Sequence, residues 1–212
     1  MYIPAHFAEH ETTRIHALIE AHPLATWVVA GEGGLQANHV PFLLDRDRGT
    51  HGTLMAHVAR ANPVWRLLES GVPALVVFQG PQAYITPNWY PAKQQHGKVV
   101  PTWNYAAVHA HGVARAVDDP QWLRALLQRL TATHEATQPA PWRLEDAPAD
   151  YTEQLLKAIV GIELPIDRLE GKWKVSQNRP AAERDGVVQG LRAQGDEGSQ
   201  AMAALVQAAL KP

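Results

Sequence analysis

The stretch TWNYAAVHAHGVARAV, residues 102–117, predicts a long β-strand from which the fold class can be inferred. Successive side chains of a strand point to opposite faces of the sheet, so odd and even positions form separate sets. The even set, residues 108–116, consists of small or short side chains around Gly112. Such a face lets another backbone or a flat ligand come close. The odd set is Ala107, His109, His111, Val113 and Arg115.

Further short strands are predicted on both sides of this stretch. They are apolar or alternating runs, several of them bounded by glycine, proline or asparagine, which is the pattern of strands joined by turns. The runs are residues 24–30, 35–45, 52–59, 72–80 and 161–171. Many short strands with tight turns favour a small Greek-key barrel of about six antiparallel strands.

Helices are predicted before, between and after these strands, so the fold class is α+β. The helix after Asn62 has that residue as its N-cap, Pro63 at its first position and Gly71 as its stop. The other predicted helices are residues 10–22, 118–130, 151–160, 180–193 and 199–210. We expect a barrel domain over residues 1–170 and a C-terminal segment, residues 171–212, packed on the barrel.

The composition excludes several classes of protein. The chain has 212 residues and no cysteine, which rules out disulfides, thiolate metal sites and a cysteine nucleophile. The net charge of −2 means that any nucleic-acid surface would have to be local. No apolar run approaches a membrane span of about 20 residues, and the N-terminus lacks the pattern of a signal peptide. We therefore expect a soluble cytoplasmic protein.

Motifs for hydrolysis, metal binding and dinucleotide binding are missing from the sequence. It contains no GxSxG elbow, no HExxH pair, no GxGxxG fingerprint and no P-loop. His39, His57, His109 and His111 could in principle supply zinc or iron ligands. We interpret them as surface or hydrogen-bonded histidines and expect no metal site.

Two segments carry residues suited to anions. In HVARANP, residues 57–63, Arg60 could form a fork with a phosphate beside a helix N-terminus that Asn62 caps. In GKWKVSQNR, residues 171–179, a strand would place Lys172, Lys174 and Ser176 on one face. The alternatives are a plain helix cap with a solvated arginine, and a charged strand edge that blocks aggregation.

A third segment, VPTWNYAAVHAHG at residues 100–112, has residues suited to a flat ring. Trp103 could stack on such a ring while the Asn104 side chain hydrogen-bonds its polar edge. An aromatic patch of the protein core is the alternative interpretation.

Six motifs in a fixed order resemble one known family. They are MYIPAHF, NHVPF, HVARANP, FQGPQAYITPNWY, VPTWNYAAVHAHG and EGKWKVSQNR. From Met1 to about Leu191 the chain resembles the PaiB-like family, described as FMN-binding negative transcriptional regulators. The resemblance implies a split β-barrel that forms homodimers and holds FMN in grooves at the subunit interface.

The resemblance also implies roles for single residues. Arg60 and Asn62 would hold the FMN phosphate, and Lys174, Ser176 and Gln177 would line the groove. Trp103 and Asn104 would lie near the isoalloxazine ring. The site expected from the sequence is therefore Arg60, Asn62, Trp103, Asn104, Lys174, Ser176 and Gln177.

Three kinds of function remain open at this point. The first is a flavin-binding regulator, although no helix-turn-helix with a basic recognition helix points to direct DNA binding. The second is an FMN-dependent oxidoreductase with a small electron donor, in which the cofactor supplies the chemistry. The third is a haem-binding split barrel. Neither a substrate nor an operator can be derived from the sequence.

Overall fold

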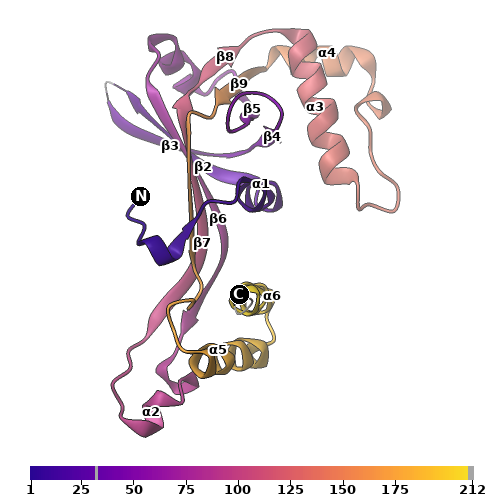
Figure 1. Cartoon of the computed structure of the whole chain (residues 1–212). Coiled ribbons are helices and arrows are strands. Elements are labelled where there is room, and N and C mark those ends of the chain that lie inside the picture. Colours follow the sequence, from indigo (N-terminus) through magenta and orange to yellow (C-terminus); the bar gives the residue numbers. More distant parts are fainter. Residues whose placement is uncertain (32, 210–212) are drawn as a thin grey trace. The chain divides into compact units, whose positions relative to one another are not determined.

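The computed structural model describes residues 1–31 and 33–209 (Figure 1). The described chain divides into two compact units. In the described part of the chain, unit 1 consists of residues 1–18, 79–108 and 170–209, and unit 2 consists of residues 19–31, 33–78 and 109–169. Strands β6 (Pro73–Ile85), β7 (Thr102–Val113) and β10 (Arg168–Lys174) contribute residues to both units. The predicted helix end at Leu210 lies outside the described residues.

The strands form a six-stranded sheet, in the order β1-β10-β7-β6-β2-β3, and a four-stranded sheet, in the order β4-β5-β9-β8. Their bounds are β1 (Ala8–Glu9), β2 (Leu24–Gly31), β3 (Gly34–Pro41), β4 (Leu43–Asp45), β5 (Thr53–Ala59), β6 (Pro73–Ile85), β7 (Thr102–Val113), β8 (Arg115–Val117), β9 (Ile159–Pro165) and β10 (Arg168–Lys174). The pairings of β1 with β10, β2 with β3 and β6, β4 with β5, and β9 with β5 and β8 are antiparallel.

Helices lie between and after the strands, so the α+β class is confirmed. The α-helices are α1 (Thr12–Ala21), α2 (Ala92–Gln95), α3 (Pro120–Glu135), α4 (Ala149–Lys157), α5 (Ala181–Gln194) and α6 (Glu197–Ala208). The 3-10 helices are η1 (Ala5–Phe7), η2 (Pro63–Ser70), η3 (Pro87–Trp89) and η4 (Leu144–Asp146). None of the helices in residues 1–31 and 33–209 has the length and apolarity to cross a membrane.

The structure has more strands than the roughly six predicted because several predicted strands are interrupted. The run over residues 35–45 divides into β3 and β4 at Phe42, whose N–H donates to Pro23 O. The run over residues 161–171 divides at Ile166 and Asp167, whose N–H groups donate to Gly52 O and His111 O. These hydrogen bonds satisfy backbone N–H groups that would pair with a neighbouring strand if the predicted strand were continuous.

Other predicted bounds also need correction. The strand expected to stop at Gly80 and Pro81 continues to Ile85, and the helix expected over residues 151–160 ends at Lys157, before β9. The helix after Asn62 is confirmed in place but is a 3-10 helix. Asn62 accepts from Val64 N, and Gly71 ends the helix with a φ of 66°.

The small-residue face of the long predicted strand is mostly buried, and its Gly112 packs closely within unit 2. A Cβ added to Gly112 would lie 2.2 Å from Pro165 O. Of the two partners expected for this face, another backbone or a flat ligand, the structure therefore places a backbone segment beside Gly112. Helix α3 packs close by, with its buried Leu126 and Leu130 against Met55 of β5. This apolar layer forms a core in unit 2.

Unit 1 pairs β1 with β10 and ends in the helical hairpin of α5 and α6 (Figure 1). Helix α5 packs directly on η3. A Cβ added at Gly186 would lie 2.0 Å from Trp89 O, and one at Gly190 would lie 2.2 Å from the Trp89 ring. Glycine at these two positions therefore allows the C-terminal helices to hold the segment that follows β6.

Candidate anion-binding site

A hollow of about 120 Å³ in unit 1 gathers two of the three cationic residues of the GKWKVSQNR segment, Lys174 and Arg179. Of the residues predicted for the site, it brings together Asn104, Lys174 and Ser176. Among the described residues, the lining is Phe7, Tyr90, Val100, Pro101, Thr102, Asn104, Lys174, Ser176, Asn178 and Arg179. The lining therefore combines cationic and polar side chains with apolar ones.

A sharp turn after β10 shapes one wall of the hollow. The strand considered for residues 173–177 does not extend that far, because β10 ends at Lys174. Ser176 has a φ of 64°, in the left-handed region that few residues other than glycine adopt. Arg179 N donates to Ser176 O over 2.9 Å and closes the turn.

A buried hydrogen bond attaches this turn to β7. The Asn104 amide nitrogen donates to Ser176 Oγ over 2.9 Å, and the two side chains are 1% and 4% exposed. Buried polar groups are costly without such partners. The bond therefore helps to hold Ser176 in its unusual conformation and to keep the turn beside β7.

Lys174 is the central cation of the site. Its Nζ donates to Thr102 Oγ1 over 2.5 Å and to Trp103 O over 2.6 Å. Burial lowers the pKa of Lys174, the interaction with Tyr105 opposes this fall, and the positive charges of Lys172 and Arg179 add to it. Among the described residues, none of these three cations has a carboxylate ion-pair partner. The cluster is therefore suited to a bound anion.

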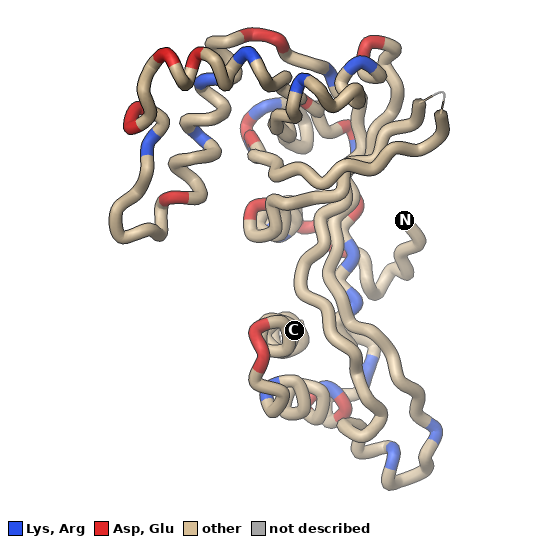
Figure 2. The backbone as a smooth tube through the Cα atoms, turned by 180° about the vertical axis from the view of Figure 1, so that it is seen from behind, with Lys and Arg blue, Asp and Glu red and all other residues tan. Residues whose placement is uncertain are grey.

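The other two cations lie against aromatic rings. Arg179 Cζ is 4.9 Å from the centroid of the Tyr90 ring. Lys172 is 8% exposed, donates to Tyr2 O over 3.0 Å and lies 5.2 Å from the centroid of the Tyr105 ring. Figure 2 marks the Lys and Arg positions of this unit in blue along the backbone. Lys172 is thus bound by the protein itself, whereas Arg179 faces the hollow.

Gln177 and Trp103 were also predicted for the site, but they lie outside the lining of the hollow. Gln177 Oε1 accepts from Val175 N over 2.8 Å, and its Nε2 donates to Trp173 O, so this side chain stabilises the turn. Trp103 is about half exposed, and its ring meets the Tyr84 ring edge-on at 6.0 Å. Trp103 therefore offers an aromatic surface, while its neighbour Asn104 is buried.

Arg60 and Asn62 belong to unit 2, where both side chains form hydrogen bonds with other groups of the protein. Arg60 Nη1 and Nη2 donate to the two oxygens of Asp118 over 2.8 and 2.6 Å, and Arg60 Nε donates to Lys157 O. The hydrogen bond from Arg60 lowers the pKa of Asp118. Asn62 caps η2 and donates to Asn38 Oδ1. The two Nη groups of Arg60 are therefore directed at a carboxylate of its own unit.

The sequence interpretation missed Tyr90, Thr102 and Arg179 as lining residues. Arg179 was visible as the third cation of its motif, and Tyr90 belongs to an aromatic and proline-rich segment, residues 82–101. Neither signal indicates a shared site, because residues so far apart in the chain are brought together only by strand pairing and by the packing of α5 on η3.

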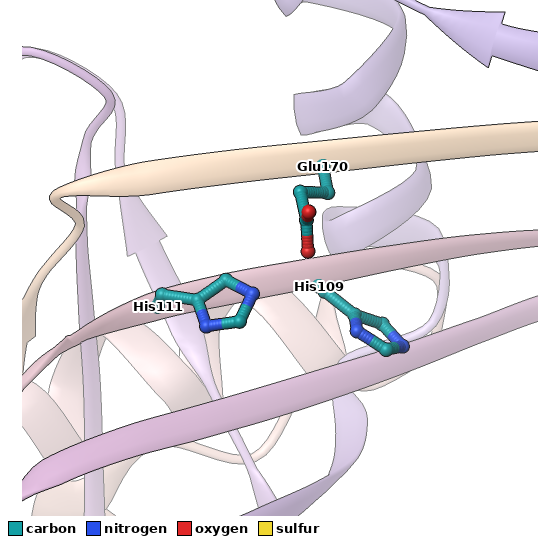
Figure 3. A group of neighbouring side chains, drawn as sticks. All are labelled: His109, His111 and Glu170. Atoms are coloured by element: carbon teal, nitrogen blue, oxygen red, sulfur yellow. The ribbon is translucent and has the colours of Figure 1, made fainter. Parts of the chain in front are cut away.

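Two of the four histidines that were predicted not to bind a metal lie on the same strand. His109 and His111 are half-buried on β7, with ring centroids 6.2 Å apart. Figure 3 shows these two residues and labels Glu170 of β10. The expectation that no metal binds stays a prediction.

The sequence is similar to one family model and to curated relatives. The model described as “Putative FMN-binding domain” matches residues 1–168. The Bacillus subtilis protease synthase and sporulation protein PAI 2 is 30% identical over 211 residues, which cover 100% of this chain and 99% of that protein. An uncharacterized protein of Emericella nidulans is 34% identical and aligns with 97% of this chain and 96% of its own length.

A solved structure shares the fold. The flavocytochrome Anf3 from Azotobacter vinelandii aligns with 79% of this chain and 69% of its own, with a TM-score of 0.60 and 15% identity. At this identity the likeness concerns the fold alone. It confirms the expected split β-barrel class.

Proposed function

The chain belongs to this FMN-binding domain family, whose cofactor is FMN, and we propose that Lys174 and Arg179 bind the FMN phosphate in the hollow of unit 1. The observation that carries the proposal is a cationic hollow without a carboxylate partner for either cation in the described chain. Arginine and lysine are the usual side chains for phosphate recognition.

The residues of the hollow fit a phosphate monoester. Ser176 Oγ, Thr102 Oγ1 and the Asn178 amide add neutral hydrogen-bonding groups beside the two cations. A hollow of about 120 Å³ has room for a phosphate but not for a whole flavin, so the ring would lie outside it. The half-exposed Trp103 ring provides an aromatic surface for that part of the ligand.

Bound FMN would supply electron-transfer chemistry, while the chain would supply its placement. Lys174 is held by Thr102 and Trp103, so its ammonium group is oriented before the ligand arrives. An anion also offsets the mutual repulsion of Lys172, Lys174 and Arg179 that lowers the pKa of Lys174. Both features favour FMN over uncharged riboflavin.

The test is a fluorescence titration of FMN and riboflavin with three proteins: wild type, Lys174→Met and Arg60→Ala. Loss of a charge-assisted contact should weaken FMN binding about 10- to 100-fold. We expect this loss for Lys174→Met, an unchanged riboflavin affinity, and little change in either affinity for Arg60→Ala. Loss of FMN affinity in Arg60→Ala alone would place the phosphate at the HVARANP segment instead.

We further propose a regulatory role, supported by the full-length similarity to the Bacillus subtilis protein PAI 2. The measurement is a gel shift with upstream DNA fragments at two salt concentrations, with and without FMN. Sequence-selective, salt-dependent binding supports a direct role in transcription. Oxidation of NAD(P)H by the FMN-loaded protein, without DNA binding, would favour the oxidoreductase alternative.

A homodimer is part of the same proposal. Tyr84 and Trp103 expose about half of their surface, next to each other on β6 and β7. Exposed aromatic pairs of this kind are common at protein interfaces. Sedimentation of wild type and of Trp103→Ser should show a dimer that the substitution weakens, and a monomeric wild type would contradict the proposal.

A further inference from the structure

Tyr90 is a buried aromatic residue that supports one of the two cations proposed to bind phosphate. It is 2% exposed and follows η3 directly. Arg179 Cζ lies 4.9 Å from the centroid of its ring, within the range of a cation–π contact. Both residues line the hollow. The ring therefore limits the positions that the guanidinium can adopt.

Helix α5 anchors the segment around Tyr90 on both sides. On the N-terminal side, Trp89 packs against Gly186 and Gly190 so closely that a Cβ at either glycine would overlap it. On the C-terminal side, Ala92 N donates to the buried Glu183 Oε1 over 3.0 Å. Tyr90 thus lies between two anchors, and its ring is held where Arg179 meets it.

The hydroxyl group of Tyr90 has no part in this arrangement. It is buried and has no hydrogen-bond partner among the described residues. Burial raises the pKa of Tyr90, the charge of Arg179 opposes the rise and that of Glu183 adds to it. The side chain is therefore a neutral phenol, and its contact with Arg179 is through the ring.

We propose that Tyr90 is a positioning residue that holds the Arg179 guanidinium towards the hollow through its ring and thereby makes the site selective for a phosphorylated flavin. The inference rests on the proposed FMN function and deepens it. The family match ends at residue 168, so both Arg179 and the helix that anchors Tyr90 lie beyond the matched segment.

The variants are Tyr90→Leu and Tyr90→Met, which remove the ring, and Tyr90→Phe, which keeps it. Methionine is the second variant because its flexible side chain fills buried space with little disruption. Circular dichroism and urea denaturation establish which variants fold. Affinities for FMN and riboflavin are then measured by fluorescence titration.

Loss of the cation–π contact should weaken FMN binding about 3- to 30-fold in the variants without the ring. Riboflavin affinity should not change, and Tyr90→Phe should bind FMN like wild type. In an Arg179→Met background, Tyr90→Met should have no further effect on FMN affinity, because the partner of the ring is already gone.

Three outcomes would overturn the inference. Unchanged FMN affinity in Tyr90→Met refutes it while the FMN function stands. Equal losses for FMN and riboflavin indicate general support of the fold rather than positioning of Arg179. A loss in Tyr90→Phe as large as in Tyr90→Met assigns the effect to the hydroxyl group. Failure of wild type to bind FMN, by contrast, removes the proposed function itself and the inference with it.

Discussion

The Asn104 side chain donates a buried hydrogen bond of 2.9 Å to Ser176 Oγ, which is 72 positions further along the chain. Asn104 lies on β7, and Ser176 is the left-handed residue of the turn after β10. The bond joins two of the predicted binding segments and fixes the wall of the hollow that Lys174 and Arg179 share.

Replacing Asn104 by alanine should destabilise the protein. It leaves the Ser176 hydroxyl buried without its side-chain partner, which costs about 1–3 kcal/mol. Urea denaturation measures the free energy of unfolding. Asn178→Ala, in the same turn but exposed, is the control and should change it by less than about 0.5 kcal/mol. Equal changes in the free energy of unfolding for the two substitutions would contradict a stabilising role of the buried hydrogen bond.

Gly190→Ala should loosen α5 from η3. The new Cβ would lie 2.2 Å from the Trp89 ring, and overpacking of this kind costs about 1–3 kcal/mol. Because the same contact anchors Tyr90, FMN affinity should fall as well. Gly198→Ala on α6 is the matched control, since its Cβ would come no closer than 3.4 Å to Asp196 Oδ1. A Gly190→Ala protein as stable as wild type would contradict the close packing of α5 on Trp89.

Glu163→Gln should destabilise unit 2 and change its response to acid. Glu163 is 1% exposed and forms ion pairs with Arg115 over 2.5 Å and with Arg48 over 2.8 Å. Burial raises the pKa of Glu163, but the hydrogen bonds and charges of the two arginines outweigh it and hold the pKa below its ordinary value. Since both arginines are partly exposed, the loss at pH 7 should be about 1–3 kcal/mol.

The acid response of Glu163 follows from this lowered pKa. Its stabilising contribution is complete above the pKa of the unfolded chain and is lost as the pH falls through the folded pKa. The unfolding free energy of wild type should therefore fall more steeply in acid than that of Glu163→Gln. Glu153→Gln, which breaks the exposed pair with Arg124, should cost at most about 1 kcal/mol. Parallel acid titrations of Glu163→Gln and wild type would exclude this role of Glu163.

Inorganic phosphate should stabilise the wild-type protein more than Lys174→Met. A ligand that binds only the folded state raises stability in proportion to the logarithm of its concentration. Thermal melts with increasing phosphate, at an ionic strength kept constant with sodium chloride, measure the shift. We expect an increase in Tm that rises with phosphate for wild type and a smaller one for the variant. The same increase in both proteins would show that phosphate does not bind at Lys174.

Much of the local structure was readable from the sequence, whereas partnerships between distant residues were not. The cap at Asn62 and the stop at Gly71 follow from short-range rules and are confirmed. The bounds that were wrong, such as the continuation of β6 past Pro81 and the end of β10 at Lys174, depend on pairing with other strands. Alternation of side chains along one strand does not reveal where its partner ends.

The sequence by itself determined the α+β class, the family and the segments that carry cations and aromatic rings, because these depend on residue types and on spacing along the chain. Only the tertiary structure decided how those residues are used. It pairs Arg60 with Asp118 and brings Lys174, Arg179 and Tyr90 to one hollow. The physical reason is that the ion-pair or ring partner of a charged side chain is set by distance in the folded chain, which strand pairing and the packing of α5 create and no local pattern encodes.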